Sequence, residues 1–239
     1  MKNNRYAGVI IAIDGPAGAG KSTVAQKLAS QLGLNYMDTG ALYRAVTLLA
    51  LRNHVELEDE KQLARLARDM KLTVDHRDGK RPPDRVFIDG EDITKAIRSN
   101  EVSEKVSRVS SHRAVRSQLV KKQCAMAEGG GIVVEGRDIG TVVFPQADLK
   151  FYVTASANER AKRRYEEMKK EGHGVSLQSI EREIIRRDHQ DSTRATNPLK
   201  QASDAVLIDT TGKSIAEVLG ILANIVREHT GRAGNDIEA

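Results

Sequence analysis

The sequence predicts an α/β fold in which helices flank a parallel sheet. Short apolar runs at residues 9–13, 132–134 and 149–153 have the length and composition of buried parallel strands. Apolar residues at helical spacing follow the first run, from Val24 to Leu32, and Gly33 is a typical helix stop. Because folds of this kind bind ligands at the carboxyl ends of their strands, the polar residues that follow these runs are the first candidates for a site.

A glycine-rich loop follows the first predicted strand. Residues 15–22 match the phosphate-binding pattern G-x-x-x-x-G-K-[ST] at every required position. Small residues let successive backbone N–H groups converge on phosphate oxygens, and the start of a helix at Lys21 adds positive potential. We expect Lys21 to reach the outer phosphates of a nucleoside triphosphate and the Ser22 hydroxyl to hold Mg²⁺. The predicted triphosphate-binding residues are Gly15, Pro16, Ala17, Gly18, Ala19, Gly20, Lys21, Ser22 and Thr23.

Composition limits the remaining possibilities. The 239 residues suffice for one substantial domain with an insert, and 38 Lys and Arg against 33 Asp and Glu give a net charge of +5. The basic residues are dispersed among acidic ones, which favours a pocket for a phosphorylated molecule over a polybasic anchor. A single cysteine, Cys124, excludes an internal disulfide framework. The run at residues 9–13 is too short for a signal peptide or a membrane span, so we expect a cytoplasmic protein.

Two polar groups are expected at the edge of the sheet. Asp38 to Arg44 follow a predicted strand at residues 34–37, and there Thr39 is expected to cap a helix that carries Tyr43 and Arg44. Arg44 is either solvated or part of a phosphate site. Glu135 to Asp138 follow the second buried strand. Polar residues at this position either have a functional role or form structural salt bridges, and the position favours the first interpretation.

The sequence changes in character from Glu58. Strand-like runs at 72–74 and 85–88, separated by a polar loop at 75–84 with two prolines, predict a small antiparallel insert over roughly residues 60–100. One long helix is expected to follow over residues 101–127, presenting Ser107 and Arg116.

The last third of the chain is rich in arginine. Ser156 to Glu159 form a capping-box pattern that opens a basic helix, which Gly172 is expected to close. Residues 155–175 are therefore either a solvated charged helix or a mobile cationic lid. A second helix starts near Ser176, and Arg187, Asp191 and Arg194 would share one of its faces if it continued that far. A surface ion-pair ladder is the alternative. A strand at 205–208, a helix at 215–226 and a disordered tail from Gly231 complete the prediction.

Together these motifs resemble the bacterial cytidylate kinases of the nucleoside monophosphate kinase group. The resemblance covers nearly the whole chain and is most specific at Asp38 to Arg44 and at Glu135 to Pro145. It implies a P-loop kinase fold, with one domain over residues 1–239, a monophosphate-binding insert at 60–128 and a helical lid at 155–175.

The same resemblance implies the reaction and the residues that serve it. ATP would bind at the phosphate-binding loop with Mg²⁺ and give its γ-phosphoryl group to CMP or dCMP. The implied catalytic residues are Lys21, Arg137, Arg187 and Arg194. The implied substrate-binding residues are Thr39, Tyr43, Arg44, Ser107, Arg116, Arg137, Asp138, Arg187, Asp191 and Arg194. Asp14, Glu135 or Asp138 would orient the waters of Mg²⁺, and the sequence does not choose among them.

Other functions remain open at this stage. The nearest is a P-loop kinase for UMP, AMP or a shikimate-type acceptor, against which the two specific motifs argue. A nucleotide-regulated nucleic-acid-binding protein would suit the basic balance, but the sequence has no aromatic stacking motif. It also lacks the Asn-Lys-x-Asp motif that reads guanine. We therefore expect small nucleotides as ligands, no nucleic-acid or membrane partner, and a monomer.

Overall fold

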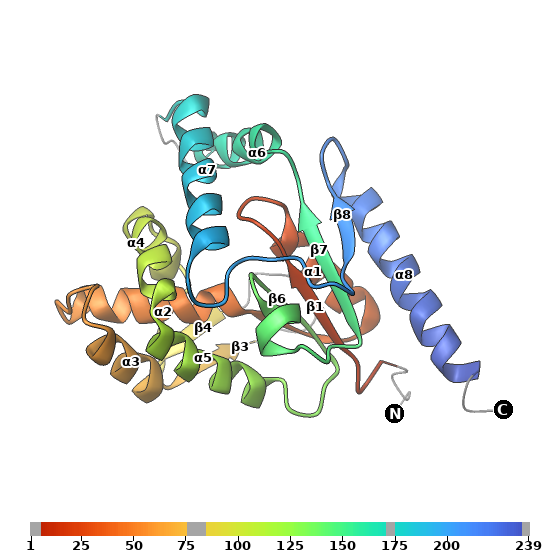
Figure 1. Cartoon of the computed structure of the whole chain (residues 1–239), viewed down its shortest axis with the longest axis horizontal. Helices are drawn as coiled ribbons and strands as arrows, with labels where there is room; N and C mark the ends of the chain where they lie inside the picture. Colours follow the sequence, from red (N-terminus) through yellow and green to blue (C-terminus); the bar gives the residue numbers. More distant parts are fainter. Residues whose placement is uncertain (1–5, 76–84, 171–174, 236–239) are drawn as a thin grey trace. The chain divides into compact units, whose positions relative to one another are not determined.

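The computed structural model describes residues 6–75, 85–170 and 175–235, and it has the predicted α/β architecture (Figure 1). The chain divides into two compact units. The first comprises residues 1–37, 129–193 and 199–239, and the second comprises residues 38–128 and 194–198.

A five-stranded sheet organises the first unit, with the order β2-β6-β1-β7-β8. Its strands are β1 (Ile10–Asp14), β2 (Asn35–Asp38), β6 (Ile132–Gly136), β7 (Leu149–Thr154) and β8 (Val206–Asp209). The central strand β1 pairs in parallel with β6 and β7, and β7 pairs in parallel with β8. Asp14 is aligned with Gly136 on one side and with Tyr152 on the other. This register brings the residues that follow β1 and β6 to the same edge of the sheet.

The helices of the first unit are α1 (Lys21–Leu32), α6 (Ala157–Lys170), α7 (Leu177–Thr193) and α8 (Ile215–Asn235). Ile11, Ile13, Leu28, Phe151 and Leu222 are fully buried and belong to a mostly aliphatic core. Gly33 ends α1 in a left-handed conformation, as predicted, and its N–H donates to the carbonyls of Ala29 and Ser30. This cap ends α1 two residues before β2 begins.

The prediction of a disordered tail from Gly231 is wrong. Helix α8 does not stop at Val226 but continues to Asn235. Val218, Leu222 and Val226 form a fully buried stripe on α8, which anchors the helix, and no proline follows to interrupt it. Residues 236–239 lie outside the described part of the chain.

The second unit contains the predicted antiparallel insert. Strands β3 (Leu72–Asp75), β4 (Arg85–Ile88) and β5 (Glu91–Asp92) form an antiparallel sheet in that order. The predicted proline-containing loop falls almost wholly at residues 76–84, outside the described residues. The helices of this unit are α2 (Thr39–Arg52), α3 (Glu60–Asp69), the short η1 (Ala96–Arg98), α4 (Asn100–Ser111) and α5 (Arg113–Met126).

Two local predictions fail in this unit. The expected single helix at 101–127 is two helices, which meet at His112 in an extended conformation (φ −72°, ψ 125°). His112 Nε2 lies 2.7 Å from the carbonyl oxygen of Leu57, and the N–H of Ala114 donates to Glu60 Oε1 at 2.7 Å. Residues distant in sequence therefore supply hydrogen-bond partners for the start of α5. Thr39 is not the cap of α2 but its first residue; Asp38 caps it, accepting from the N–H of Ala41.

Candidate active site

The phosphate-binding loop has the backbone that its glycines predict. Gly15, Gly18 and Gly20 adopt φ values of +147°, +74° and +84°. A Cβ on Gly15 would lie 1.9 Å from the carbonyl oxygen of Val153, so only glycine fits there. Helix α1 begins at Lys21, directly after this loop, and the exposed Ser22 lies in its first turn. The loop thus directs the N-terminus of a 12-residue helix toward a ligand, as phosphate binding requires.

Lys21 lies folded back over this loop. Its side chain is buried, and its Nζ donates to the carbonyl oxygen of Pro16 at 2.7 Å. Burial, and after it the positive charge of Arg137, lower the pKa of Lys21 to about 7, against the opposing charges of Glu135, Asp14 and Asp191. A phosphate group beside Lys21 would favour its protonated form and restore its full charge.

Three buried carboxylates lie at the same edge of the sheet. Asp14 ends β1 and accepts hydrogen bonds from the backbone N–H groups of Ile139 and Gly140, at 2.8 Å and 2.7 Å. Glu135 Oε1 accepts a hydrogen bond of 2.5 Å from the hydroxyl of Tyr36. The third carboxylate, Asp138, is 3% exposed. All three belong to the predicted site, and both oxygens of Asp14 are already engaged by the backbone.

A π-helical turn, η2 (Ile139–Val143), follows these carboxylates and was not predicted. Turns of this kind are rare and are frequent at functional sites. A single helical turn is too short to produce a detectable periodicity in the sequence. The polar residues that precede it, Glu135 to Asp138, were nevertheless predicted to be functional. The turn places Arg137 and Asp138 between a buried strand and a backbone segment that Asp14 holds.

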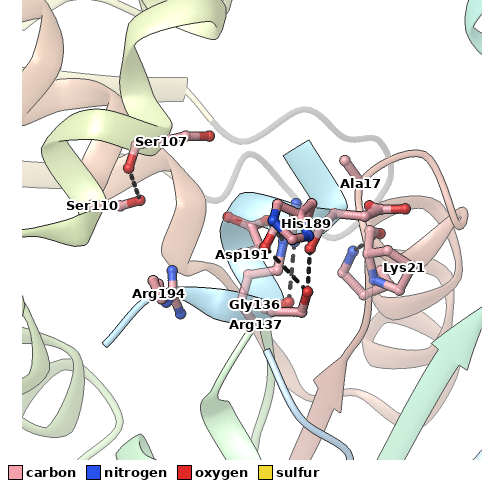
Figure 2. Close-up of polar contacts among 12 residues, drawn as sticks. Ala17, Lys21, Ser107, Ser110, Gly136, Arg137, His189, Asp191 and Arg194 are labelled. Carbon is pink, nitrogen blue, oxygen red and sulfur yellow. Dashed lines mark hydrogen bonds and ion pairs between the residues drawn. The ribbon is translucent and has the colours of Figure 1, made fainter. Parts of the chain in front are cut away.

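Arg137, Arg187 and Asp191 form a charged cluster, part of which Figure 2 shows. Arg137 Nε donates to Asp191 Oδ2 at 2.9 Å, and its side chain also donates to the carbonyl oxygen of Gly136. Burial lowers the pKa of Arg187, and the positive charge of Arg137 contributes to this. Among the described residues, Arg187 Nε has no hydrogen-bond partner although it is buried. The cluster thus concentrates two guanidinium groups at one carboxylate.

Arg194 does not share the helix face of this cluster, contrary to the spacing argument. Helix α7 ends at Thr193, and Arg194 belongs to the second unit, where its Nε donates to the carbonyl oxygen of Asn197 at 2.7 Å. Asn197 adopts a left-handed conformation, and Pro198 follows it. Since neither feature is compatible with helix, the chain turns here.

The second unit holds the other predicted substrate residues. Arg116 is 2% exposed, its guanidinium lies 5.1 Å from the centre of the Tyr43 ring, and it donates to the carbonyl oxygen of Ser110. Arg44 on α2 donates to the carbonyl oxygen of Ile97 and to Ser103 Oγ, so this side chain is anchored and not merely solvated. Thr39 is buried at the start of α2. Ser107 lies in α4, where its carbonyl oxygen accepts from Ser110 Oγ (Figure 2).

Two arginines of α6 are linked to the phosphate-binding loop, Arg160 directly and Arg163 through Thr210, and the sequence marked them only as part of a basic helix. Arg160 is 5% exposed, donates to both carboxylate oxygens of Asp188 on α7 and also donates to the carbonyl oxygen of Ala17. Arg163 donates to the hydroxyl and the carbonyl of Thr210, whose hydroxyl contacts the carbonyl oxygen of Ala19. The start of the predicted lid region is therefore packed on the loop. Their spacing alone does not distinguish these arginines from the exposed basic residues of the same helix. The expected stop at Gly172 lies outside the described residues.

A family model described as cytidylate kinase matches residues 11–228. The chain belongs to the cytidylate kinase family. A cytidylate kinase of Caldanaerobacter subterraneus subsp. tengcongensis is 50% identical over 222 residues, which are 93% of this chain and 96% of that protein. A bifunctional pantoate ligase/cytidylate kinase of a Synechococcus species is 48% identical over 225 residues, 94% of this chain but 42% of that protein. The resemblance inferred from the motifs is thus confirmed.

Comparison with solved structures gives weaker matches. A gluconokinase of Sinorhizobium meliloti 1021 shares 13% sequence identity with a TM-score of 0.48, covering 98% of this chain and 97% of that one. Within the described parts of the chain, every helix is either too short or too polar to cross a membrane.

Proposed function

We propose that this protein transfers the γ-phosphoryl group of ATP to CMP or dCMP, giving ADP and CDP or dCDP. As a member of the cytidylate kinase family it is a phosphotransferase that acts on CMP. The observation that carries the proposal is the set of cationic side chains, Lys21, Arg137 and Arg187, at the edge of the sheet where the phosphate-binding loop begins.

The geometry of the first unit supports catalysis by positioning and charge. Phosphoryl transfer gathers negative charge on the moving group, so fixed cations stabilise its transition state more than its ground state. Lys21 would leave the carbonyl of Pro16 for the outer phosphates of ATP, and Arg137 and Arg187 would face the phosphoryl group. Asp191 holds the Arg137 guanidinium in place. A general base is not needed, because the attacking oxygen of a nucleoside monophosphate is already anionic.

We assign recognition of the acceptor mainly to the second unit. Arg44 and Thr39, with Tyr43, would bind the acceptor phosphate, and Arg137 would complete that site. Ser107 and Arg116, with Asp138, would read the cytosine, and Arg194 would serve the sugar and the phosphates with Arg187 and Asp191. The anchoring of Arg44 and the burial of Arg116 support these roles, since preorganised donors lose little entropy on binding. Buried donors and acceptors that match cytosine would be left unpaired when another base binds, and this would give selectivity for CMP and dCMP.

A divalent cation fits the donor end of this site. ATP-dependent phosphoryl transfer in kinases generally uses Mg²⁺, which keeps several waters and needs only one or two protein ligands. Ser22 Oγ would hold it, because this hydroxyl is exposed in the first turn of α1 beside the loop. When bound, the ion neutralises charge on the phosphate oxygens. Glu135 and Asp138 are the better candidates for orienting its waters, since Asp14 is engaged by the backbone.

The remaining expectations stay predictions. They are a single kinase domain with the insert and lid boundaries given above, a cytoplasmic location, a monomeric state and the lack of nucleic-acid partners.

The deciding experiment measures ADP formation from ATP and Mg²⁺ with CMP, dCMP, UMP, AMP and shikimate offered separately as acceptors. We expect a strong preference for CMP and dCMP. Equal stimulation by all acceptors, or none by CMP, would contradict the substrate assignment. Binding to an unrelated RNA at physiological salt would instead revive the nucleic-acid hypothesis.

A further inference from the structure

We propose that Asp14 is a positioning residue that clamps the η2 turn to the end of β1 and thereby sets Arg137 and Asp138 for the reaction. The inference rests on the proposed phosphoryl transfer, because the two residues that it positions are assigned to that reaction. The clamp itself is defined by geometry alone and can be tested separately.

The contacts of Asp14 join two distant parts of the chain. Its Oδ1 accepts from the N–H of Ile139 at 2.8 Å, and its Oδ2 accepts from the N–H of Gly140 at 2.7 Å. These are the first two N–H groups of η2, which a helical turn cannot satisfy internally. Asp138 precedes the turn but makes no side-chain cap hydrogen bond to it. Asp14 therefore caps the turn from another element, 125 residues away in sequence from Ile139.

The residues packed around the η2 turn leave little room for it to move. A Cβ on Gly140 would lie 3.1 Å from Lys150 Cδ and 3.4 Å from Asp14 Oδ2, both tight or close contacts. Just beyond the far end of the turn, Lys150 Nζ donates to the carbonyl oxygen of Pro145 and to Asp204 Oδ2, each at 2.7 Å. The segment is thus fixed on both sides, by Asp14 at its start and by Lys150 after its end. Because Arg137 and Asp138 directly precede η2, a shift of the turn would move them.

The environment of Asp14 agrees with a geometric role. The residue is 4% exposed and lies on the central strand of the sheet. Burial, with a smaller contribution from the charge of Asp138, raises the pKa of Asp14 to about 6, although the N–H groups of Gly140 and Ile139 and the charge of Lys21 oppose the rise. On β7, Tyr152 is aligned with Asp14, and Lys150 lies two residues earlier, beside Gly140. Protonation would remove one acceptor and loosen the clamp.

The main test is Asp14→Asn. The asparagine can accept one of the two N–H groups through its oxygen, but its NH₂ group would face the other donor. A buried N–H without an acceptor is costly, so the η2 turn should shift away from this arrangement. Because the shift would displace Arg137 and Asp138, we expect kcat to fall about tenfold or more. We expect the KM for ATP and the Mg²⁺ concentration for half-maximal rate to stay close to those of the parent protein, because no residue of the phosphate-binding loop is replaced and a bound phosphate keeps Lys21 protonated without Asp14. The kcat of the parent should fall more steeply below pH 6 than that of the variant, because the acceptor phosphate titrates in both proteins whereas residue 14 titrates only in the parent.

Asp148→Asn is the matched control. Asp148 Oδ2 accepts from the N–H of Ile10 at 2.8 Å, so it makes the same kind of contact at the opposite end of β1. We expect kinetics close to those of the parent protein. A loss equal to that of Asp14→Asn would assign the effect to general loosening of the strand and overturn the proposal.

Amide hydrogen exchange measures the clamp without any activity. In the parent protein the amides of Ile139 and Gly140 should be protected and their NMR shifts should titrate near pH 6, and in Asp14→Asn at least one should exchange faster.

If Asp14→Asn folds poorly, Gly140→Ala tests the packing of the η2 turn with Asp14 intact. We expect a lower kcat at unchanged KM for ATP in this variant. Unchanged protection and kcat in both variants would refute the clamp. Recovery of Asp14→Asn at high Mg²⁺ would assign Asp14 to the metal instead. Failure of the acceptor panel would withdraw the reaction but leave the exchange result valid.

Discussion

The ion pairs beside the phosphate-binding loop differ from those of the second unit in burial. In the Arg160–Asp188 pair the side chains are 5% and 27% exposed, and in Arg137–Asp191 they are 23% and 8% exposed. In the second unit, the Arg52–Glu91 pair is 42% and 59% exposed. Burying a charge is costly unless its partner is well placed, whereas an exposed pair is screened by water. Buried pairs are therefore poor stabilisers on balance, and their presence at one edge of the sheet points to function.

The largest expected effect follows from removing a partly buried cation of the candidate site. We predict that Arg137→Ala lowers kcat by roughly 10³-fold or more, because an arginine that stabilises the transferring phosphoryl group contributes on that scale. Circular dichroism should show a retained fold. Steady-state kinetics with ATP and CMP measure the effect, and Arg137→Lys, which keeps the charge without the planar guanidinium, is the control. Turnover near that of the parent protein in Arg137→Ala would remove Arg137 from the mechanism.

A second prediction concerns the arginine that sequence reasoning missed. Arg160→Met leaves Asp188 without its bidentate partner and removes the contact to the carbonyl oxygen of Ala17. We expect a loss of about 3 kcal/mol in the free energy of unfolding, measured by urea denaturation. The double variant with Asp188→Asn should recover part of this loss, since no uncompensated charge remains. A loss in the free energy of unfolding no larger than that caused by breaking the exposed Arg52–Glu91 pair would show that burial does not distinguish the ion pairs beside the loop from those of the second unit.

A third prediction concerns pH. The pKa of Asp14 is raised from 3.8 to about 6 in the folded protein, so between these values the folded state binds more protons than the unfolded state. The free energy of unfolding should therefore fall as pH rises from about 4 to about 6, by at most about 3 kcal/mol from this group. The difference in stability between the parent protein and Asp14→Asn, from urea denaturation at pH 4.5 and pH 7, isolates the contribution. A constant difference between the two pH values would contradict it.

The smallest effect is expected at the exposed pair. Arg52→Ala removes two hydrogen bonds to Glu91 on β5, but both side chains are largely in water. We expect neither kcat nor the urea midpoint to change measurably. A clear loss of stability here would contradict the comparison between the two sets of ion pairs.

Much of the fold was predictable because its signals are local. The strands at residues 10–14 and 132–136, the stop of α1 at Gly33 and the antiparallel insert each follow from apolar patterning or from turn residues in consecutive positions. The helix break at His112 did not, because the residues that support it, Leu57 and Glu60, are about 55 residues distant in sequence.

The sequence by itself determined the phosphate-binding loop, the family and which polar residues follow the buried strands. These depend on residue identity at fixed spacing, which needs no tertiary contact to be read. Only the tertiary structure decided that Arg194 leaves the helix of Arg187 and Asp191, that Arg160 is buried against Asp188, and that both oxygens of Asp14 cap a turn on another segment. Each of these depends on which groups meet after the chain has folded, and burial and partners, not spacing, then set the charge and the geometry of the site.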